Sequence, residues 1–423
     1  MKNYLTVNKK KIIFLVILLA SILIIHFNFL GTKDHIYKTY PNLRIHKAFF
    51  SKISIVEKVK NDYNVKFLPD TQFEKFSFVK KKFNFDKNYY LANSNVKAGV
   101  ASPPVRSFYF EFVNDKVWVI DYTGKIYELN EQSLIEKNLT NLDGQIISSN
   151  FSTTKVLDTY IHNNKIYISY VDSEGCNKIN VVFAEIKLQK LNFEKFFKTD
   201  ECAKLVLAGR MYFHNHQGKE GLLLTTHGHP NNIPDNTPQD DNSVYGKILF
   251  IDFESKNPII FSKGHRNGIG LYADKNVILQ TSHGPRGGDE INKIIYNKNY
   301  GWPIASYGGV YDFKYGDPIT YKKNHKSFGF EEPIFSFVPS IGISEIIKLP
   351  NDFSDHFIDN FLIASLNGRS LYRVKFDKDY TKLLFIEKIF NNRRVRDLKY
   401  HSKFKVILLA FEETAEIAII SKK

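Results

Sequence analysis

The sequence predicts an all-β protein, a six-bladed β-propeller at residues 107–423, preceded by an N-terminal transmembrane anchor helix at residues 12–30. Three observations predict this: a lysine-flanked apolar run near the N-terminus, abundant aromatic residues, and a strand–turn–strand pattern that recurs six times. Aromatic residues make up 15% of the chain and favour the pleated, half-buried surface of a sheet. With 423 residues and 43% hydrophobic content, the chain can bury a large core.

The N-terminal segment predicts the anchor. Residues 1–11 carry four lysines and form a basic cytoplasmic region, and Ile12 to Leu30 is an apolar run of nineteen residues without a lysine. This length is close to the roughly 20 residues that a spanning helix needs. Lysines before the run place the N-terminus inside. Gly31 to Lys33 offer no small-x-small cleavage pattern, so we expect an uncleaved, single-pass anchor with the propeller on the extracytoplasmic, periplasmic side.

The repeat is clearest at residues 107–130, where turns at Asn114-Asp115 and Thr123-Gly124 separate three apolar strands. Asn, Asp and Gly tolerate the backbone angles of tight hairpin turns. Further copies begin near Lys155, Gly209, Gly268, Ile343 and Arg394. Six such units favour radial repetition. A β-sandwich is the alternative, but it does not predict a grouping into three or four strands. Residues 31–106 do not follow the repeat, and we expect a linker and covering segment there.

Charge and cysteine content narrow the class of protein. The net charge of +15 is spread along the chain, without a basic stripe interleaved with aromatics. We therefore expect a lysine-rich solvated surface and no nucleic-acid partner, with attraction to anionic lipid headgroups or acidic glycans as the alternative. Cys176 and Cys202 lie at the two ends of a strand-like segment. A disulfide between them and two buried free thiols both remain open.

The stretch 264–309 concentrates unusual residues in loops between strands. Arg266-Asn267 precedes one strand, and the glycine-rich run from His283 to Glu290 follows the next. Glycines allow close backbone approach and leave carbonyl groups open, and Asp289-Glu290 supplies hard oxygen ligands. This combination suits Ca²⁺. The alternative is a glycine-rich turn with solvated acids.

Three motifs in this stretch, GHRN, HGPRGGDEIN and NYGWP, resemble in order and spacing the signature of the soluble pyrroloquinoline-quinone (PQQ) aldose dehydrogenases. These belong to the glucose/sorbosone dehydrogenase family and are six-bladed propellers. A looser resemblance runs from Ser107 to the C-terminus and includes NNRRVRD at 391–397. It implies that arginines bind the carboxylates of PQQ, that Ca²⁺ polarises the quinone, and that a histidine removes the proton of the sugar's anomeric hydroxyl.

The resemblance also assigns roles to individual positions. The cofactor contacts match Arg266, Asn267, Arg394 and Arg396. The catalytic Ca²⁺ ligands match the backbone carbonyls of Gly284 and Pro285, and the structural calcium positions match Asp289, Glu290 and Tyr300. At four positions this sequence differs from the family's pattern. Val206 stands where the family has its catalytic histidine, Leu205 replaces the preceding acid, Asn367 replaces a lysine, and a threonine near Thr153 replaces a glutamine.

Two histidines are candidates for a substitute base or a metal ligand: His227 and His229, in a loop expected to face the central pocket. Ordinary loop hydrogen bonding is the alternative for this pair. His283 precedes Gly284-Pro285, and we expect it to orient that loop.

Three functions remain open at this point. The first is a membrane-anchored dehydrogenase that oxidises an aldose at C1 and passes electrons to a membrane acceptor. The second is a non-catalytic, calcium-stabilised propeller that binds a glycan or an envelope partner. The third is lactone hydrolysis at a calcium ion in the same place. Because valine cannot accept a proton, we favour catalytic inactivity or altered chemistry.

Overall fold

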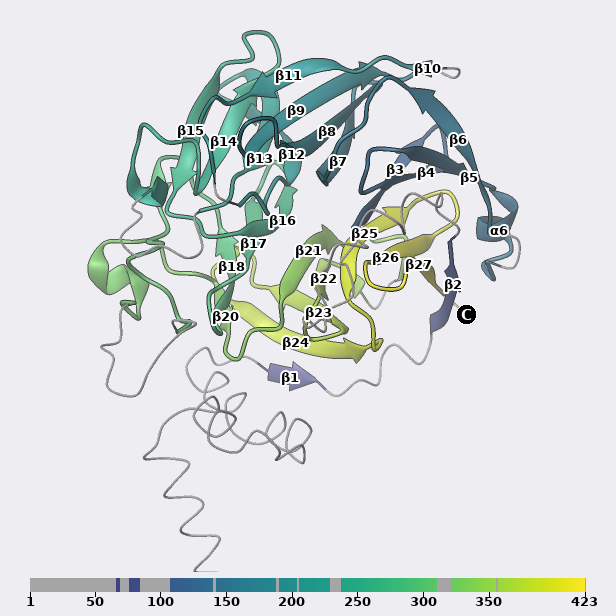
Figure 1. The fold of residues 1–423 in the computed structure, drawn as a ribbon. Coiled ribbons are helices and arrows are strands. Elements are labelled where there is room, and N and C mark those ends of the chain that lie inside the picture. Colours follow the sequence, from purple (N-terminus) through teal and green to yellow (C-terminus); the bar gives the residue numbers. More distant parts are fainter. Residues whose placement is uncertain are drawn as a thin grey trace, which may run out of the picture. The chain divides into compact units, whose positions relative to one another are not determined.

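The computed structural model describes residues 66–68, 76–83, 107–139, 142–187, 190–203, 205–228, 237–309, 321–354 and 357–422. These residues form six sheets of four or five strands around a common centre (Figure 1). The predicted all-β, six-bladed propeller is confirmed. The predicted anchor at 12–30 lies outside the described residues, and within the described ranges no helix has the length and apolar character to span a bilayer.

The first three sheets come from the first half of the propeller, except that a short later strand joins the edge of sheets 1 and 3. Sheet 1 contains β3 (Phe108–Val113), β4 (Lys116–Asp121), β5 (Ile126–Leu129), β6 (Gly144–Ser149) and β10 (Lys190–Leu191). Sheet 2 contains β7 (Val156–His162), β8 (Lys165–Asp172), β9 (Lys178–Glu185) and β11 (Glu194–Lys198). Sheet 3 contains β12 (Met211–His216), β13 (Lys219–Thr225), β14 (Lys247–Asp252), β15 (Pro258–Lys263) and β19 (Lys298–Asn299).

The other three sheets complete the circle. Sheet 4 contains β16 (Gly268–Ala273), β17 (Ile278–Ser282), β18 (Asp289–Lys293) and β20 (Phe335–Phe337). Sheet 5 contains β21 (Ile343–Lys348), β22 (Asn360–Ser365), β23 (Ser370–Phe376), β24 (Leu383–Phe390) and β1 (Lys66–Leu68). Sheet 6 contains β25 (Val395–His401), β26 (Val406–Phe411), β27 (Glu416–Lys422) and β2 (Phe76–Lys82). Short helical turns, α6 (Gln132–Ile135), η3 (Thr237–Gln239) and η4 (His325–Phe328), lie in connections.

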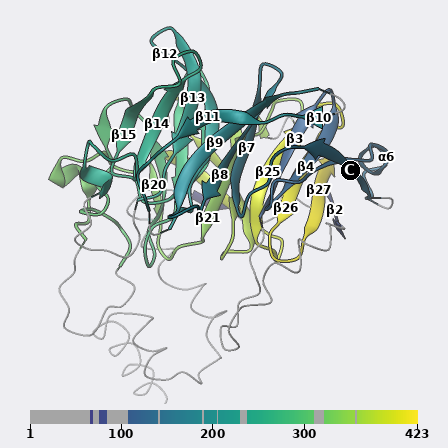
Figure 2. The same ribbon diagram turned by 45° about the horizontal axis from the view of Figure 1, so that its top comes forward.

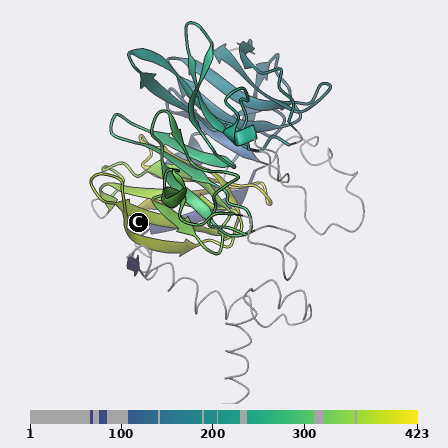
Figure 3. The same cartoon turned by 90° about the vertical axis from the view of Figure 1, so that its left-hand side faces the viewer.

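Local sequence explains the hairpins. Asn114 and Asp115, between β3 and β4, both have positive φ (47° and 67°), as do Asn163 and Asn164 between β7 and β8 (47° and 57°). Two consecutive residues with positive φ define the type I′ turn, whose twist matches that of the flanking strands. Neighbouring sheets then pack face to face (Figure 2, Figure 3). A strand such as β14 is therefore buried along its whole length.

The ring closes through strands far apart in the sequence. The inner strands contact one another in the order β3, β7, β12, β16, β21, β25 and back to β3. β2 pairs antiparallel with β27 over its full length, from Phe76 opposite Lys422 to Lys82 opposite Glu416. The outermost strand of sheet 6 thus comes from the segment 31–106, which also supplies β1 along β24.

A single buried guanidinium group, that of Arg210, joins the inner strands at the hub. Its Nη1 lies 2.7 Å from Asp158 Oδ1, 2.8 Å from Glu345 Oε2 and 3.4 Å from Asp397 Oδ1. Three further contacts complete the circle: Nε to the Ile269 carbonyl oxygen at 2.9 Å, Nη2 to the Arg396 carbonyl oxygen at 2.9 Å, and the guanidinium carbon over the Tyr109 ring at 5.1 Å. Arg210 therefore links all six sheets.

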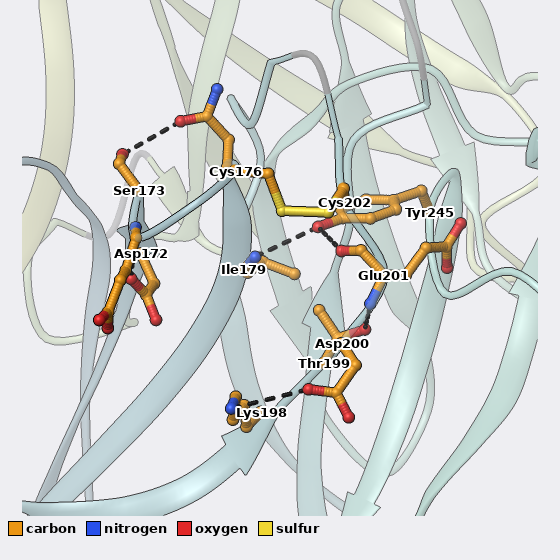
Figure 4. Close-up of a disulfide and its surroundings, with 12 residues drawn as sticks. Asp172, Ser173, Cys176, Ile179, Lys198, Thr199, Asp200, Glu201, Cys202 and Tyr245 are labelled. Atoms are coloured by element: carbon orange, nitrogen blue, oxygen red, sulfur yellow. Dashed lines mark hydrogen bonds and ion pairs between the residues drawn. A yellow bond between two sulfur atoms is a disulfide. The ribbon is translucent and has the colours of Figure 1, made fainter.

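The two cysteines form a disulfide in sheet 2 (Figure 4). Cys176 precedes β9 and Cys202 follows β11, and their Cα atoms lie 5.8 Å apart. Beside the disulfide, the Tyr245 hydroxyl accepts from the Ile179 N–H at 3.3 Å and donates to the Glu201 carbonyl at 3.1 Å. Of the two possibilities that the sequence left open, the structure has the disulfide.

Candidate functional site

The predicted cofactor residues lie where an inner strand begins or where the second strand of the same sheet ends. In an antiparallel hairpin these two places meet at one end. Arg266-Asn267 precedes β16, and His283 to Pro285 follow β17, whose Ser282 pairs with Gly268. Arg394 and Arg396 lie at the start of β25.

Arg266 is the centre of a small pocket in sheet 4. It is 9% exposed, its Nη1 donates to the His283 carbonyl oxygen at 2.9 Å, and its guanidinium carbon lies 5.4 Å from the centre of the Trp302 ring. Asn267 Nδ2 lies 3.4 Å from His283 Nδ1. The lining of the pocket includes Arg266, His283, Gly284, Pro285, Glu290 and Trp302. The structure thus brings Arg266 and Asn267 to the Gly284-Pro285 turn.

The two late arginines share one buried carboxylate. Glu412, which follows β26, is 1% exposed. Its Oε1 accepts from Arg394 Nε at 2.9 Å and lies 2.8 Å from Arg394 Nη2; its Oε2 accepts from Arg396 Nε at 2.7 Å and lies 2.6 Å from Arg396 Nη2. Sequence analysis did not single out Glu412. Arg394 Nε also lies 3.2 Å from Glu413 Oε1, so Glu412 fixes both arginines and Glu413 adds a second contact to Arg394.

Charged groups of two sheets affect the protonation of His283. Burial lowers the pKa of His283 to about 4; Asp289 opposes this, and Arg396 and Arg266 lower the pKa further. Cations from sheets 4 and 6 therefore both act on His283. An imidazole with this pKa is neutral at physiological pH, which suits the predicted role of orienting the Gly284-Pro285 turn.

Around Val206, the position that the sequence resemblance matches to the family's histidine, the side chains are apolar. Val206 is 2% exposed and packs in the hydrophobic cluster that contains Leu157 and Met211. The residues on either side, Leu205 and Leu207, are 40% and 36% exposed. If the family's histidine matched Leu205 or Leu207 in place of Val206, the side chain at that position would still be unable to accept a proton.

A lysine that no sequence motif indicated, Lys155, contacts the backbone at Val206. Lys155 precedes β7, and its Nζ donates to the Val206 carbonyl oxygen at 2.8 Å. Burial is the main cause that lowers the pKa of Lys155 to about 8; Arg396 adds to it, and Glu412 opposes it. The only sequence signal was a lysine directly before the second inner strand, which is weak because the surface is rich in lysine.

Of the two candidate histidines, the structure describes one. His227 follows β13 and is 1% exposed. The next residue, Gly228, donates its N–H to the Arg266 carbonyl oxygen at 2.7 Å, so His227 lies beside the Arg266 pocket. His229 lies outside the described residues.

The candidate calcium ligands fall into two groups. The carbonyl oxygens of Gly284 and Pro285 accept no hydrogen bond from the described part of the chain. Asp289 and Glu290 are consecutive residues of β18, and consecutive side chains of a strand point to opposite faces. Together with Tyr300 they therefore do not converge on one point. No cluster of three or more His, Cys, Asp or Glu side chains suited to a metal occurs in the described ranges.

Comparison with known proteins tests the resemblance. The family model for glucose/sorbosone dehydrogenase matches residues 107–419. Aldose sugar dehydrogenase YliI of Escherichia coli (strain K12) is 28% identical over 232 residues, which cover 51% of this chain and 60% of that protein. Quinoprotein glucose dehydrogenase B of Acinetobacter calcoaceticus is 23% identical over 310 residues, 62% of each protein. The match thus spans about three fifths of these relatives' length.

Solved structures agree on the fold. The apo form of the soluble aldose sugar dehydrogenase from Escherichia coli matches with a TM-score of 0.63 and 19% identity, covering 82% of this chain and 100% of that chain. The PQQ-bound aldose sugar dehydrogenase from Streptomyces coelicolor matches with a TM-score of 0.55 and 16% identity, covering 82% and 98%. Since the family match spans nearly the whole propeller, from its first inner strand to its last outer one, the chain belongs to the glucose/sorbosone dehydrogenase family.

Proposed function

We propose that this chain is a membrane-anchored, extracytoplasmic propeller that binds PQQ and a sugar or glycan but does not oxidise aldoses by its family's histidine-base route. The observation that carries the proposal is the apolar run Leu205-Val206-Leu207, which provides no proton acceptor at the base position. A positioned general base contributes roughly 10²–10⁴-fold to a reaction rate. We expect at least this loss relative to a family member with the histidine.

The residues that would hold PQQ fit its charge. Arg266 and Asn267 on one side, and Arg394 and Arg396 on the other, offer guanidinium and amide donors of the kind that bind carboxylates. Glu412 orients both late arginines. PQQ beside a Ca²⁺ ion on the Gly284 and Pro285 carbonyls would supply a polarised quinone oxygen as hydride acceptor. A sugar would then be bound without losing the proton of its anomeric hydroxyl.

The proposed location draws on two features. Lysines precede the apolar run at 12–30, which favours an anchor with the propeller outside. The Cys176–Cys202 disulfide is typical of an oxidising compartment such as the periplasm. Attachment to the membrane would place the propeller near an electron acceptor or an envelope partner.

A second candidate, a working aldose dehydrogenase, is favoured by one observation. Lys155 places its Nζ 2.8 Å from the Val206 carbonyl oxygen, and burial lowers its pKa to about 8, near physiological pH. A general base works best when its pKa is near the pH of the reaction. In this candidate, neutral Lys155 would accept the proton that histidine accepts elsewhere in the family, and electrons would pass to a membrane acceptor.

The test uses the full chain purified in detergent. The chain has two tryptophans, Trp118 in the core and Trp302 against Arg266. In a Trp118→Phe variant Trp302 is the only tryptophan, so the tryptophan fluorescence of this variant reports on the Arg266 pocket. We expect PQQ, added with Ca²⁺, to quench this fluorescence saturably, and Arg266→Ala to weaken the quenching.

In the same preparation we expect no reduction of an electron-accepting dye with glucose or other aldoses. Turnover that Lys155→Met abolishes would establish the second candidate. Turnover that survives changes at Lys155, His227 and His229 would refute the claim that the base is missing. An absence of quenching at saturating PQQ would refute cofactor binding.

A further inference from the structure

The three positions associated with structural calcium are already engaged by hydrogen-bond donors or face a histidine side chain. The Asp289 carboxylate shows this most completely. Its Oδ1 accepts from the Gly284 N–H at 3.1 Å, and its Oδ2 accepts from the N–H groups of Ile341 and Ile343, both at 2.9 Å. A carboxylate with three backbone N–H donors is satisfied without a metal. Asp289 therefore ties the Gly284 turn to the start of β21.

Glu290 and Tyr300 face one imidazole, that of His325. His325 begins η4 and is 1% exposed. Its Nδ1 lies 3.1 Å from the Tyr300 carbonyl oxygen, and its Nε2 lies 3.6 Å from Glu290 Oε1. The ring also stacks on Tyr307, with 5.5 Å between ring centres and 11° between planes. The other oxygen of Glu290 accepts from Asn292 at 3.3 Å.

A lysine from the same segment engages further oxygen atoms nearby. Lys323, two residues before His325, donates from Nζ to the Ser306 carbonyl oxygen at 2.8 Å and to that of Gly308. Calcium in proteins is held by carboxylate and carbonyl oxygens. Here such oxygens on one side of sheet 4 are engaged by two basic side chains of one segment.

The Tyr300 hydroxyl also has hydrogen-bond partners within the protein. It donates to the Lys293 carbonyl oxygen at 2.5 Å and accepts from the Ile295 N–H at 2.9 Å. These bonds hold the turn between β18 and β19. The hydroxyl and the carbonyl of Tyr300 therefore both have protein partners.

We propose that His325 and Lys323 replace the structural calcium in this chain, by binding the Tyr300, Ser306 and Gly308 carbonyls and facing Glu290. The loops around sheet 4 are then held by protein groups alone, and no Ca²⁺ binds at Glu290 and Tyr300. This is independent of PQQ binding and of the separate Gly284-Pro285 carbonyls. It predicts a propeller that keeps its stability where calcium is scarce.

The test is the thermal unfolding of the full chain without PQQ, in EGTA and in about 1 mM CaCl₂, a concentration that fills extracellular calcium sites. We expect no rise in Tm that depends on Glu290; an ion held by the Gly284 and Pro285 carbonyls alone would change Tm equally in the wild type and in Glu290→Gln. A ligand that binds only the folded state raises Tm, so a calcium-dependent rise in the wild type that Glu290→Gln abolishes would overturn the proposal. A rise that Glu290→Gln retains would locate the ion elsewhere and support the assignment of these oxygens to His325.

Variants test the replacement itself. We expect His325→Ala to lower Tm in EGTA, because the Tyr300 carbonyl loses its donor and Glu290 its neighbour. The matched control is Lys326→Ala, an exposed side chain of the same turn, which should leave Tm unchanged. A His325→Ala protein as stable as this control would contradict the proposal, and if His325→Ala does not fold, the wild-type comparison still decides.

Discussion

Glu345 at the hub should make the folding stability depend on pH. Three carboxylates, those of Asp158, Glu345 and Asp397, surround one guanidinium group, that of Arg210. Burial is the main cause that raises the pKa of Glu345 from 4.5 to about 8; Asp397 and Asp158 add to it, and Arg210 opposes it. A carboxyl group whose pKa is higher in the folded than in the unfolded chain binds its proton more tightly when folded. Its contribution to stability is therefore present in full below pH 4.5 and is lost as the pH rises towards 8.

The magnitude follows from the size of the shift. Each pKa unit corresponds to about 1.36 kcal/mol, so a shift of roughly three units gives an upper bound of about 4–5 kcal/mol, and relaxation of the hub reduces it. We expect the Glu345 contribution to the free energy of unfolding to fall by roughly 2–4 kcal/mol between pH 5 and pH 8, while His283 and His265, whose pKa burial lowers to about 4 and about 3, contribute a rise between pH 5 and pH 6.5. Glu111, whose pKa burial raises to about 7 against the effect of Lys399, adds a fall of the same sign as that of Glu345.

The perturbation is Glu345→Gln, which imitates the neutral carboxyl group. Denaturant unfolding at several pH values between 5 and 8.5 should show that the free energy of unfolding of the wild type falls with pH relative to that of the variant, because the contributions of Glu111, His283 and the other titrating groups are common to both proteins. The matched control is Glu254→Gln, at an exposed glutamate, which should keep the wild-type slope. An equal slope in Glu345→Gln and the control would mean that the proton is not on Glu345, and would refute this reasoning.

Other predictions concern single contacts. Arg210→Met should cost about 3–5 kcal/mol of unfolding free energy, since it leaves buried carboxylates without their cation; urea unfolding measures this, and a loss below 1 kcal/mol would contradict the hub assignment. Under the second candidate function, Lys155→Met should abolish dye reduction with an aldose, whereas Lys187→Met, at an exposed lysine, should not; equal activities in the two variants would exclude Lys155 as a base. Replacing Cys176 and Cys202 by serine opens a loop of 26 residues, and should lower stability by about 3 kcal/mol, which thermal unfolding with and without reductant would show; an unchanged stability would refute the chain-entropy argument.

The sequence predicted those parts of the fold that local residues determine. The Asn114-Asp115 turn could be predicted because few residues other than glycine adopt positive φ, and two in succession imply a hairpin. β2 could not be predicted in the same way. Its partner β27 is separated from it by most of the chain, and nothing within the sequence FSFVKKK states which edge it joins.

In the candidate site, too, contiguous motifs could be interpreted from the sequence, whereas long-range contacts could not. The stretch 264–309 could be interpreted because its motif is contiguous, and the structure does place Arg266 and Asn267 beside Gly284 and Pro285. Glu412 escaped notice because a lone glutamate becomes meaningful only once sheet 6 folds it under the late arginines.

Lys155 and His325 escaped notice for a related reason. Each acts on a backbone carbonyl of another segment, Val206 for Lys155 and Tyr300 for His325. A contact to backbone leaves no trace in the partner's residue type, so spacing and composition could not reveal it.

The most direct test of the account is a single-turnover experiment on the full chain loaded with PQQ and Ca²⁺. Mixed anaerobically with excess glucose, without any electron acceptor, the bound cofactor should keep the absorption spectrum of its oxidised form, because no group at Leu205, Val206 or Leu207 accepts the sugar's proton. Complete and rapid conversion to the spectrum of the reduced cofactor would contradict the account, since a base must then act on the sugar.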